Sequence, residues 1–404
     1  MRVLLAHPGT QHARRIAREL ERHGLLGEFW TGLALAEHGF AAGLVTRFRQ
    51  LPRVKGLSNR IVAGVPATRL RCVKFNELCA IVRLGRGGDA LRIIHERNEK
   101  FQDAIPDANL RACDAIIAFD TSAWRLAERA QALGRPFYLD RTIAHPAAFA
   151  RIEAELHRRY PEWCPAFEPR PEYLTAAEAA EHRLARRIVV GSSFARDTLV
   201  AEGVPAGRVG VNPYGVDWSR FAPPPPASGT RPLRFLFLGS HLARKGLPVL
   251  LDAWRALGPK RGEAELWLAG HCGERERRLI PVLPGLKVRG LVPHADVPTL
   301  LASCDVFVLP SWLEGFSLTL LEALASGLPV ISTPNSGATD LVTAPVLGRI
   351  VAPGSVEELL AALESHLASP PDRVAVRAAC VPLRSRFSWE AYGDRWAALL
   401  QETN

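Results

Sequence analysis

The sequence predicts an α/β protein with two domains, each built around a parallel sheet. Short runs rich in β-branched and aromatic residues alternate with helical spacing, and the clearest such unit covers residues 306–332. Strands that alternate with helices are typical of parallel sheets. The stretch APPPPA at 222–227 is stiff and marks a boundary. We therefore expect a first domain at 1–220, a linker at 221–230, a second domain at 231–385 and a last helix within 386–404.

Length and composition limit the classes of protein to which the chain can belong. The chain has 404 residues, 48% hydrophobic and 23% charged, which is typical of a soluble globular protein with large cores. No apolar run approaches the roughly 20 residues of a membrane helix. The start, MRVLLAHPG, fits a first strand better than a signal peptide. Seven cysteines without a Cys-x-x-Cys pair favour reduced thiols, a cytoplasmic setting and no structural zinc.

The net charge of +10 is concentrated in one segment. Residues 41–100 hold 13 basic and four acidic side chains, interleaved with Leu, Val and Phe. Three interpretations stay open: an element that lies on an anionic membrane, a surface for an anionic glycolipid or polysaccharide, or a solvated arginine-rich surface. No nucleic-acid-binding motif accompanies the charge, so nucleic acid is not an expected partner.

The first half begins with a strand at 3–6, the loop HPGTQHA and a helix over 13–23. A loop between a first strand and a first helix is where α/β proteins approach phosphates. No G-x-G-x-x-G is present, however, and Gly9 fits a simple tight turn equally well. Further helices are expected over 33–49 and 89–102.

Two later strands, at 115–119 and 136–140, end at polar residues. The first ends at Asp120, and the second runs into the loop DRTIAHPAAF. His145 in that loop follows the carboxyl end of a strand, which is where open α/β sheets carry site residues. A lone histidine is nevertheless more often structural.

The second half opens with a strand at 233–238 and the loop GSHLARKG at 239–246. Lysine supplies a point charge and arginine a planar fork, so Arg244 and Lys245 suit a diphosphate, although two exposed cations would give the same pattern. Two more strands and an amphipathic last helix follow, at 265–270, 287–292 and 387–400.

The clearest candidate site is the stretch PSWLEGFSLTLLEALASG at 310–327. A buried strand at 306–309 precedes it, and apolar residues then recur at helical spacing. Free N–H groups at the helix start, near 316–319, can bind an anion. Glu314 and Glu322 lie on either side, and carboxylates accept hydrogen bonds from sugar hydroxyls but repel phosphates. The layout predicts a nucleotide sugar as ligand, unless both glutamates are simply solvated.

The block EGFSLTLLEALASGLPVISTPNSGATDLV resembles the signature of the family-four retaining glycosyltransferases, in which seven residues separate two glutamates. The resemblance covers 187–400 well and 1–150 loosely. It implies the GT-B fold, in which two Rossmann-like domains face each other across a cleft and the last helix crosses back to the first domain. The chain departs from the family at a later turn, where Ser336-Gly337 and Asp340 replace two glycines and a glutamate.

The resemblance also implies roles for single residues. Glu314 would contact the donor sugar, Glu322 would hold the ribose, and His145 would lie beside the reacting carbon. The residues expected to carry the reaction are Glu314, His145, Lys245 and Arg244; those expected to bind the donor are Glu322, Gly315, Phe316, Ser317, Leu318, Thr319, Gly239 and Val292; and those expected on the acceptor side are Gly9, Thr10, His12, Arg141 and Asp120.

The expected function is transfer of a sugar from a UDP- or GDP-sugar to a hydroxyl of a glycan or glycolipid, with retention. The chain contains no Asp-x-Asp, so neither a metal nor another cofactor is expected, and Arg244 and Lys245 would stabilise the diphosphate. Two alternatives stay open: a sugar-nucleotide 2-epimerase of the same architecture, and a non-catalytic partner subunit that binds nucleotide or carbohydrate. We expect a cytoplasmic protein, peripheral on the inner face of the membrane if residues 41–100 bind lipid.

Overall fold

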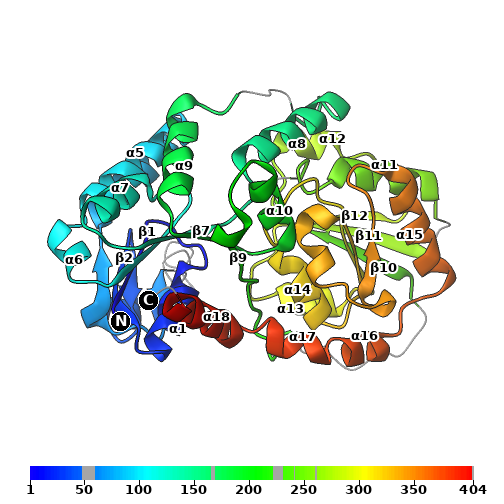
Figure 1. Ribbon diagram of the computed structural model, residues 1–404. Coiled ribbons are helices and arrows are strands. Elements are labelled where there is room, and N and C mark those ends of the chain that lie inside the picture. Colours follow the sequence, from blue (N-terminus) through cyan, green and yellow to red (C-terminus); the bar gives the residue numbers. More distant parts are fainter. Residues whose placement is uncertain (48–59, 165–168, 222–230, 241, 260–261, 403–404) are drawn as a thin grey trace.

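The computed structural model describes the chain apart from residues 48–59, 165–168, 222–230, 241, 260–261 and 403–404. Figure 1 shows two lobes, and each contains a parallel β-sheet covered by helices. This confirms the predicted fold class, an α/β protein with two parallel-sheet domains. The linker expected at 221–230 lies outside the described residues, apart from Phe221.

Among the described residues, the first domain is built on a seven-stranded parallel sheet in the order β5-β2-β1-β6-β7-β8-β9. Its central strands β1 and β6 are buried at every position, as expected where helices cover both faces of a sheet. The strands are β1 (Val3–His7), β2 (Leu26–Thr31), β5 (Leu70–Cys72), β6 (Ala115–Phe119), β7 (Phe137–Arg141), β8 (Arg187–Val190) and β9 (Val209–Val211). The helices are α1 (Ala13–Arg22), α2 (Phe40–Arg47), α4 (Lys74–Gly85), α5 (Ala90–Asp103), α6 (Asp107–Arg111), α7 (Trp124–Ala132), α8 (Pro146–Arg159), α9 (Glu172–Leu184) and α10 (Ser193–Ala201).

The second domain contains, in the part of the chain that is described, a six-stranded parallel sheet in the order β12-β11-β10-β13-β14-β15. Its strands are β10 (Leu233–Leu238), β11 (Ala264–Ala269), β12 (Leu286–Gly290), β13 (Val306–Leu309), β14 (Val330–Ser332) and β15 (Gly348–Ile350). The helices are α11 (Leu247–Leu257), α12 (Glu274–Leu279), α13 (Val297–Ala302), α14 (Leu318–Ala325), α15 (Val356–Ala368), α16 (Arg373–Ala379), α17 (Val381–Arg386) and α18 (Trp389–Glu402). Of the helices described, none combines the length and the hydrophobicity needed to cross a membrane.

Residues 26–85 differ most from the sequence prediction. The single helix expected over 33–49 is wrong at its start, where a short strand, β3 (Leu35–Ala36), pairs with β4 (Ile61–Val62) before α2 begins. Strand β2 was not predicted, because Glu28 and the adjacent glycine interrupt the apolar pattern of LGEFWT. Helix α4 was not predicted either, because few of its apolar residues face the sheet.

The order of strands reverses at one point in each sheet. In the first sheet β1 lies between β2 and β6, and in the second β10 lies between β11 and β13. At such a point the loops that follow the two central strands leave in opposite directions and open a crevice at the carboxyl ends of the strands. The loops after β10 and β13 carry Arg244, Lys245 and Glu314, so the topology itself brings these side chains together.

Helix α18 connects the two domains. In Figure 1 it returns, in red, to the first domain and packs beside α1. Gly393 permits this approach, because a Cβ at that position would lie only 2.4 Å from the Cβ of Glu19. The buried phenol of Tyr392 donates a hydrogen bond of 3.0 Å to Asp140 Oδ2, which lies on β7. A polar contact within the core therefore ties the end of the chain to the first sheet.

We expect the substitution Tyr392→Phe to lower the free energy of unfolding by about 1–3 kcal/mol, because Asp140 Oδ2 would lose its buried donor. Urea unfolding followed by tryptophan fluorescence measures the change. Tyr173→Phe is the matched control, since that side chain lies partly in solvent. Equal midpoints for the Tyr392 variant and the wild type would contradict this account of how α18 is held.

Candidate active site

Three charged side chains meet at the switch point of the second sheet. Glu314 Oε1 lies 3.1 Å from Arg244 Nη1 and 3.6 Å from Lys245 Nζ, and all three side chains are mostly buried. Two glycines shape the loop that supplies the cations. A Cβ at Gly239 would lie 2.5 Å from Lys245 Cδ, and one at Gly246, where φ is +81°, would lie 2.0 Å from the carbonyl oxygen of Pro310.

Glu314 keeps hydrogen-bonding capacity that the protein does not use. Its Oε1 is buried and has no hydrogen-bond partner among the described residues, because Arg244 is not aligned to donate to it and Lys245 Nζ, at 3.6 Å, lies too far away. Arg244 Nη1 instead donates to the carbonyl oxygen of Leu313 at 2.5 Å. A buried acceptor without a donor is costly, so this oxygen is suited to accept a hydrogen bond from a ligand.

The anion site predicted at 316–319 is only partly available at the start of α14. The N–H of Ser317 is not free, because it donates to the carbonyl oxygen of Ser336 at 3.0 Å. Within the described residues, the N–H groups of Leu318 and Thr319 have no acceptor, as expected for the first turn of a helix. The donors available to a ligand are therefore fewer than the sequence indicated.

Glu322 lies on the same helix in a largely apolar environment. Burial raises the pKa of its carboxyl to about 7, and the positive charges of Arg220 and Lys245 oppose that rise. The carboxylate accepts no hydrogen bond from the described protein atoms. Arg220 was not predicted as a site residue; its Nη2 donates to Nδ1 of His294 at 2.7 Å, in the loop that also carries the half-buried Val292. No motif in the sequence indicated that Arg220 lies near Glu322.

The two domains touch at Gly315. A Cβ at this position would lie 1.8 Å from the carbonyl oxygen of Thr142, so a side chain does not fit between the two loops. Ser192 Oγ donates a hydrogen bond to the carbonyl oxygen of Gly315. The next residue, Phe316, is buried with its ring edge-to-face against Tyr214 at 5.7 Å. Gly315 and Phe316, which were predicted to bind the donor, lie where the two domains join.

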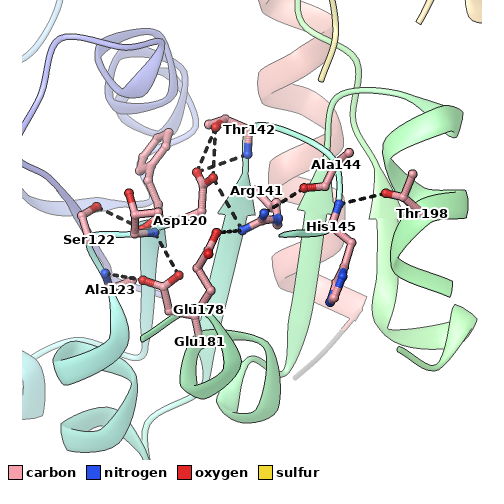
Figure 2. A network of polar contacts seen from close by, with 12 residues as sticks. Asp120, Ser122, Ala123, Arg141, Thr142, Ala144, His145, Glu178, Glu181 and Thr198 are labelled. Carbon is pink, nitrogen blue, oxygen red and sulfur yellow. Dashed lines mark hydrogen bonds and ion pairs between the residues drawn. The ribbon is translucent and has the colours of Figure 1, made fainter. Parts of the chain in front are cut away.

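Asp120 and Arg141 belong to a buried network at the carboxyl ends of β6 and β7 (Figure 2). Asp120 Oδ1 accepts hydrogen bonds from the backbone N–H of Thr142, at 3.3 Å, and from its hydroxyl, at 3.0 Å. Arg141 Nη1 lies 3.7 Å from Asp120 and donates to Glu178 Oε1 at 3.0 Å. Burial raises the pKa of Asp120, while the charge of Arg141 opposes the rise.

The position of Arg141 does not match the predicted acceptor contact. The side chain is only 1% exposed, and Nη2 donates to the carbonyl oxygen of Ala144 at 2.8 Å. Nη1 and Nη2 thus donate to protein groups within the network of Figure 2, whereas Nε is buried without a hydrogen-bond partner among the described residues. Arg141 therefore supports the loop from behind, because its bond to Ala144 fixes the backbone immediately before His145.

His145 is the N-cap residue of α8. Its Nδ1 accepts a hydrogen bond from the N–H of Ala147 at 3.2 Å. Its backbone N–H donates to Thr198 Oγ1 at 3.0 Å, as Figure 2 shows. Burial lowers the pKa of the imidazole, and the charge of Arg141 lowers it further. The ring is therefore neutral at pH 7, and because Nδ1 accepts, the proton lies on Nε2. His145 can act as a hydrogen-bond donor through Nε2.

A strained loop lies beside this network and was not predicted. Thr121 has φ of +61°, which is unfavourable for a β-branched residue. The two carboxylate oxygens of Glu181 hold the loop by accepting from the N–H groups of Thr121, at 2.9 Å, and Ala123, at 2.8 Å (Figure 2). Burial raises the pKa of Glu181 to about 8. Strain of this kind is often stored next to functional sites.

The three residues predicted in the first loop have different environments. Gly9 packs against the ring of His7, and Thr10 is exposed. His12 is 9% exposed, and its Nε2 lies 3.1 Å from Asp140 Oδ1. Its ring also packs on Tyr214 at 4.3 Å. His12 therefore lies in the polar core between the domains, and the predicted acceptor contact does not match its position.

The family model and the curated relatives that resemble this chain are glycosyltransferases. Residues 232–369 match the family described as glycosyl transferases group 1. A protein of Escherichia coli (strain K12) named for colanic acid biosynthesis, the glycosyltransferase WcaL, is 30% identical over 213 residues, covering 49% of this chain and 52% of that protein. The GDP-mannose-dependent monoacylated alpha-(1-6)-phosphatidylinositol monomannoside mannosyltransferase of Corynebacterium glutamicum is 34% identical over 211 residues, covering 47% and 55%. The chain spans about half the length of the curated relatives it matches.

A solved structure resembles the whole chain. The sucrose-phosphate synthase of Thermosynechococcus elongatus superposes with a TM-score of 0.68, covering 100% of this chain and 99% of that one. The sequence identity is 17%, so the likeness concerns the fold alone. It confirms the predicted GT-B arrangement of two domains.

We expect Gly315→Ala to separate the loops that carry Thr142 and Gly315 and to destabilise the protein by about 1–3 kcal/mol, because the new methyl group would overlap a backbone carbonyl. Thermal unfolding measures the effect. Gly207→Ala is the control, since no atom lies within 4 Å of a Cβ built there. Equal losses in the two variants would show that the contact between the domains is not tight.

Glu322→Gln should stabilise the protein at alkaline pH. The pKa of this carboxyl in the folded state, about 7, lies above the ordinary value of 4.5, so the stability present below pH 4.5 is lost as pH rises through 7. The variant cannot ionise and should gain about 2 kcal/mol over the wild type at pH 8 and nothing at pH 4. Unfolding at both pH values tests this; a gain that is the same at each would contradict a titrating Glu322.

Proposed function

We propose that this chain, whose residues 232–369 belong to the group 1 glycosyl transferases, is a retaining glycosyltransferase of family four that moves a sugar from a nucleotide sugar to a hydroxyl of a glycan or glycolipid. One observation carries the proposal. Arg244, Lys245 and Glu314 meet where the strand order of the second sheet reverses, next to the contact of Gly315 with the first domain. A ligand bound beside this cluster would lie close to both domains.

The two cations are suited to the diphosphate of the donor. Arg244 and Lys245 both lie within 4 Å of Glu314, so the cluster has a net positive charge in a mostly buried setting. A diphosphate would gain more from these charges as its bond to the sugar breaks, because negative charge then develops on the leaving oxygen. The pair could do this without a metal ion, and we propose a metal-independent reaction.

The two glutamates are suited to the hydroxyls of the donor. Glu314 Oε1 is a buried acceptor without a donor, and a sugar hydroxyl would satisfy it. Glu322 accepts no hydrogen bond from the described protein atoms, and its position on α14 suits the hydroxyls of a ribose. Donation by two hydroxyls to this carboxylate would also favour its ionised form, so donor binding should weaken as pH falls below about 7.

His145 is the first-domain residue that the geometry supports best as a sugar contact. Its imidazole is neutral, and Nε2–H is free to donate to a hydroxyl. In the proposed reaction the acceptor oxygen attacks the anomeric carbon on the face that the diphosphate leaves. The bond to the diphosphate breaks, the new glycosidic bond forms, and the leaving phosphate oxygen takes the proton of the acceptor. No protein base is required in this scheme.

The names of the relatives support the class of donor and acceptor. One relative is named for GDP-mannose and for a phosphatidylinositol mannoside, and another for the biosynthesis of colanic acid. We propose a glycan or glycolipid acceptor for this chain, and GDP-mannose is the first donor to test. We also propose peripheral association with an anionic membrane through residues 41–100. Nothing in the comparisons supports the alternative of a 2-epimerase.

A ligand screen tests the donor site. Thermal unfolding is measured with GDP, UDP, ADP and their common sugars, with and without EDTA, for the wild type and for Arg244→Ala. We expect one nucleotide to raise the unfolding temperature of the wild type, with or without EDTA, and to leave that of Arg244→Ala unchanged. If no nucleotide raises the unfolding temperature of folded wild-type protein, the result would instead support a non-catalytic subunit.

We expect Glu314→Ala to reduce sugar transfer at least about 100-fold while the protein stays folded, because the variant lacks the acceptor placed for the donor sugar. Transfer of labelled sugar from the bound nucleotide to a bacterial lipid extract measures the loss. Glu357→Ala, at an exposed position of α15, is the control and should transfer normally. Normal transfer by the Glu314 variant would overturn the assignment of the site.

A further inference from the structure

Helix α4 exposes a stripe of apolar side chains to solvent. Phe75 is 76% exposed, Leu78 48% and Val82 51%, and their spacing of three and four residues places them on one side of the helix. Cys79 is exposed on the same side. Large apolar side chains gathered on one exposed helix face mark an interaction site more often than singly scattered ones do.

The opposite side of α4 is anchored, so the stripe cannot turn inward. Glu77 and Ala80 are buried on that side. The carboxylate of Glu77 is held by two arginines: Oε2 accepts from Arg97 Nη1 at 2.7 Å, and Oε1 accepts from Arg60 Nη1 at 3.3 Å. A helix that buries an ion-paired glutamate and exposes phenylalanine has its polarity reversed with respect to an ordinary surface helix.

The stripe ends at a basic hollow. Arg86 follows Val82 on the same side of the helix, and a cavity of about 220 Å³ lies between the ends of α4 and α5, lined by Arg83, Arg86, Gly88, Asp89, Arg92 and Ile93. Arg83 and Arg92 both contact Glu96. The guanidinium of Arg86 makes no hydrogen bond or ion pair with the described residues, which leaves it available to an external anion.

We propose that this face of α4 docks on an anionic lipid bilayer, with Phe75, Leu78 and Val82 among the acyl chains and Arg86 at a lipid phosphate. An apolar helix face flanked by basic residues is the pattern of a helix that lies in a membrane interface. The excess of basic residues in 41–100 complements anionic lipid. Arg49, Arg53 and Lys55 of that segment lie outside the described residues.

The docking face is connected to the acceptor side of the proposed active site, and its role in catalysis rests on the proposed function. The N–H of Val73, just before α4, donates to the carbonyl oxygen of Thr31 at the end of β2. The carboxylate of Glu77 packs against Gly32, whose N–H donates to the carbonyl oxygen of Pro8 at 3.2 Å. Helix α4 therefore packs its buried side near the loop of Gly9, and a bilayer on the opposite, exposed side would lie one helix diameter, ~10 Å, from that side. A lipid-linked acceptor could reach the first loop across this distance.

Co-sedimentation with vesicles tests the docking face. Vesicles of phosphatidylcholine are compared with vesicles that also contain phosphatidylglycerol. We expect the wild type to bind the anionic vesicles, the double variant Phe75→Gln/Val82→Gln to bind at least tenfold more weakly, and Arg86→Gln about fivefold more weakly. The matched control is Val282→Gln/Val374→Gln, which changes two exposed valines of the second domain.

Two further measurements distinguish membrane docking from dimerisation through the stripe. The emission of a fluorophore attached to Cys79 should shift to shorter wavelength when anionic vesicles are added, because the residue would enter the membrane interface. Analytical ultracentrifugation without lipid tests whether a second copy of the chain covers the stripe; a dimer that the double variant dissociates would overturn the proposal. Equal vesicle binding by the double variant and the wild type would overturn it as well.

The same variants separate this inference from the proposed function. The double variant should keep the thermal shift with nucleotide, since α4 lies in the first domain and the cations lie in the second. Loss of vesicle binding with nucleotide binding retained supports docking through α4. If the wild type binds vesicles but no nucleotide, the result would support docking through α4 and contradict the proposed transferase function.

Discussion

The approach of Gly315 to the carbonyl oxygen of Thr142 is the constraint on which the site depends. No side chain fits between these two backbones, so the loop after β13 and the loop after β7 are held in one relative position. Glu314 precedes the contact on one side, and His145 follows it on the other. The edge-to-face pair of Phe316 and Tyr214 and the return of α18 add apolar packing around the same point. These contacts keep the loops that carry Glu314 and His145 at a fixed separation.

Behind that contact lies a network of charged side chains, and the burial of each one costs free energy. Arg141 faces three carboxylates, those of Asp120, Glu178 and Glu181, in a region with little solvent. Burial of charge is tolerated when the group is paired and hydrogen-bonded, as Arg141 is through Nη1 and Nη2. In return, the network fixes the position of the strained backbone at Thr121 and of the turn before His145. A rigid framework of this kind holds the side chain of His145 in one orientation.

The second domain shows the opposite arrangement, with groups left unsatisfied. Glu314 has a buried oxygen without a donor, and burial raises the pKa of Glu322. Both carboxyls lie near the positive charge of Lys245. Groups that destabilise the free protein in a cleft are typical of functional sites, because a ligand can satisfy them. The exposed stripe of α4 follows the same logic at the surface, where bilayer contact would remove apolar side chains from water.

The sequence by itself determined the local elements of the second domain and which loops carry its charged residues. The apolar runs of β10 and β13 and the spacing of α14 are local signals, so the residue pattern alone places the loops that carry Arg244, Lys245 and Glu314. Only the tertiary structure decided what the polar residues of the first domain do. Arg141, at the end of strand β7, meets Glu178 of helix α9, and His12 meets Asp140 across more than a hundred residues, so no spacing in the sequence reports either pair. The same holds for α4, because periodicity shows that a helix has an apolar side but only packing decides whether that side faces the core or solvent.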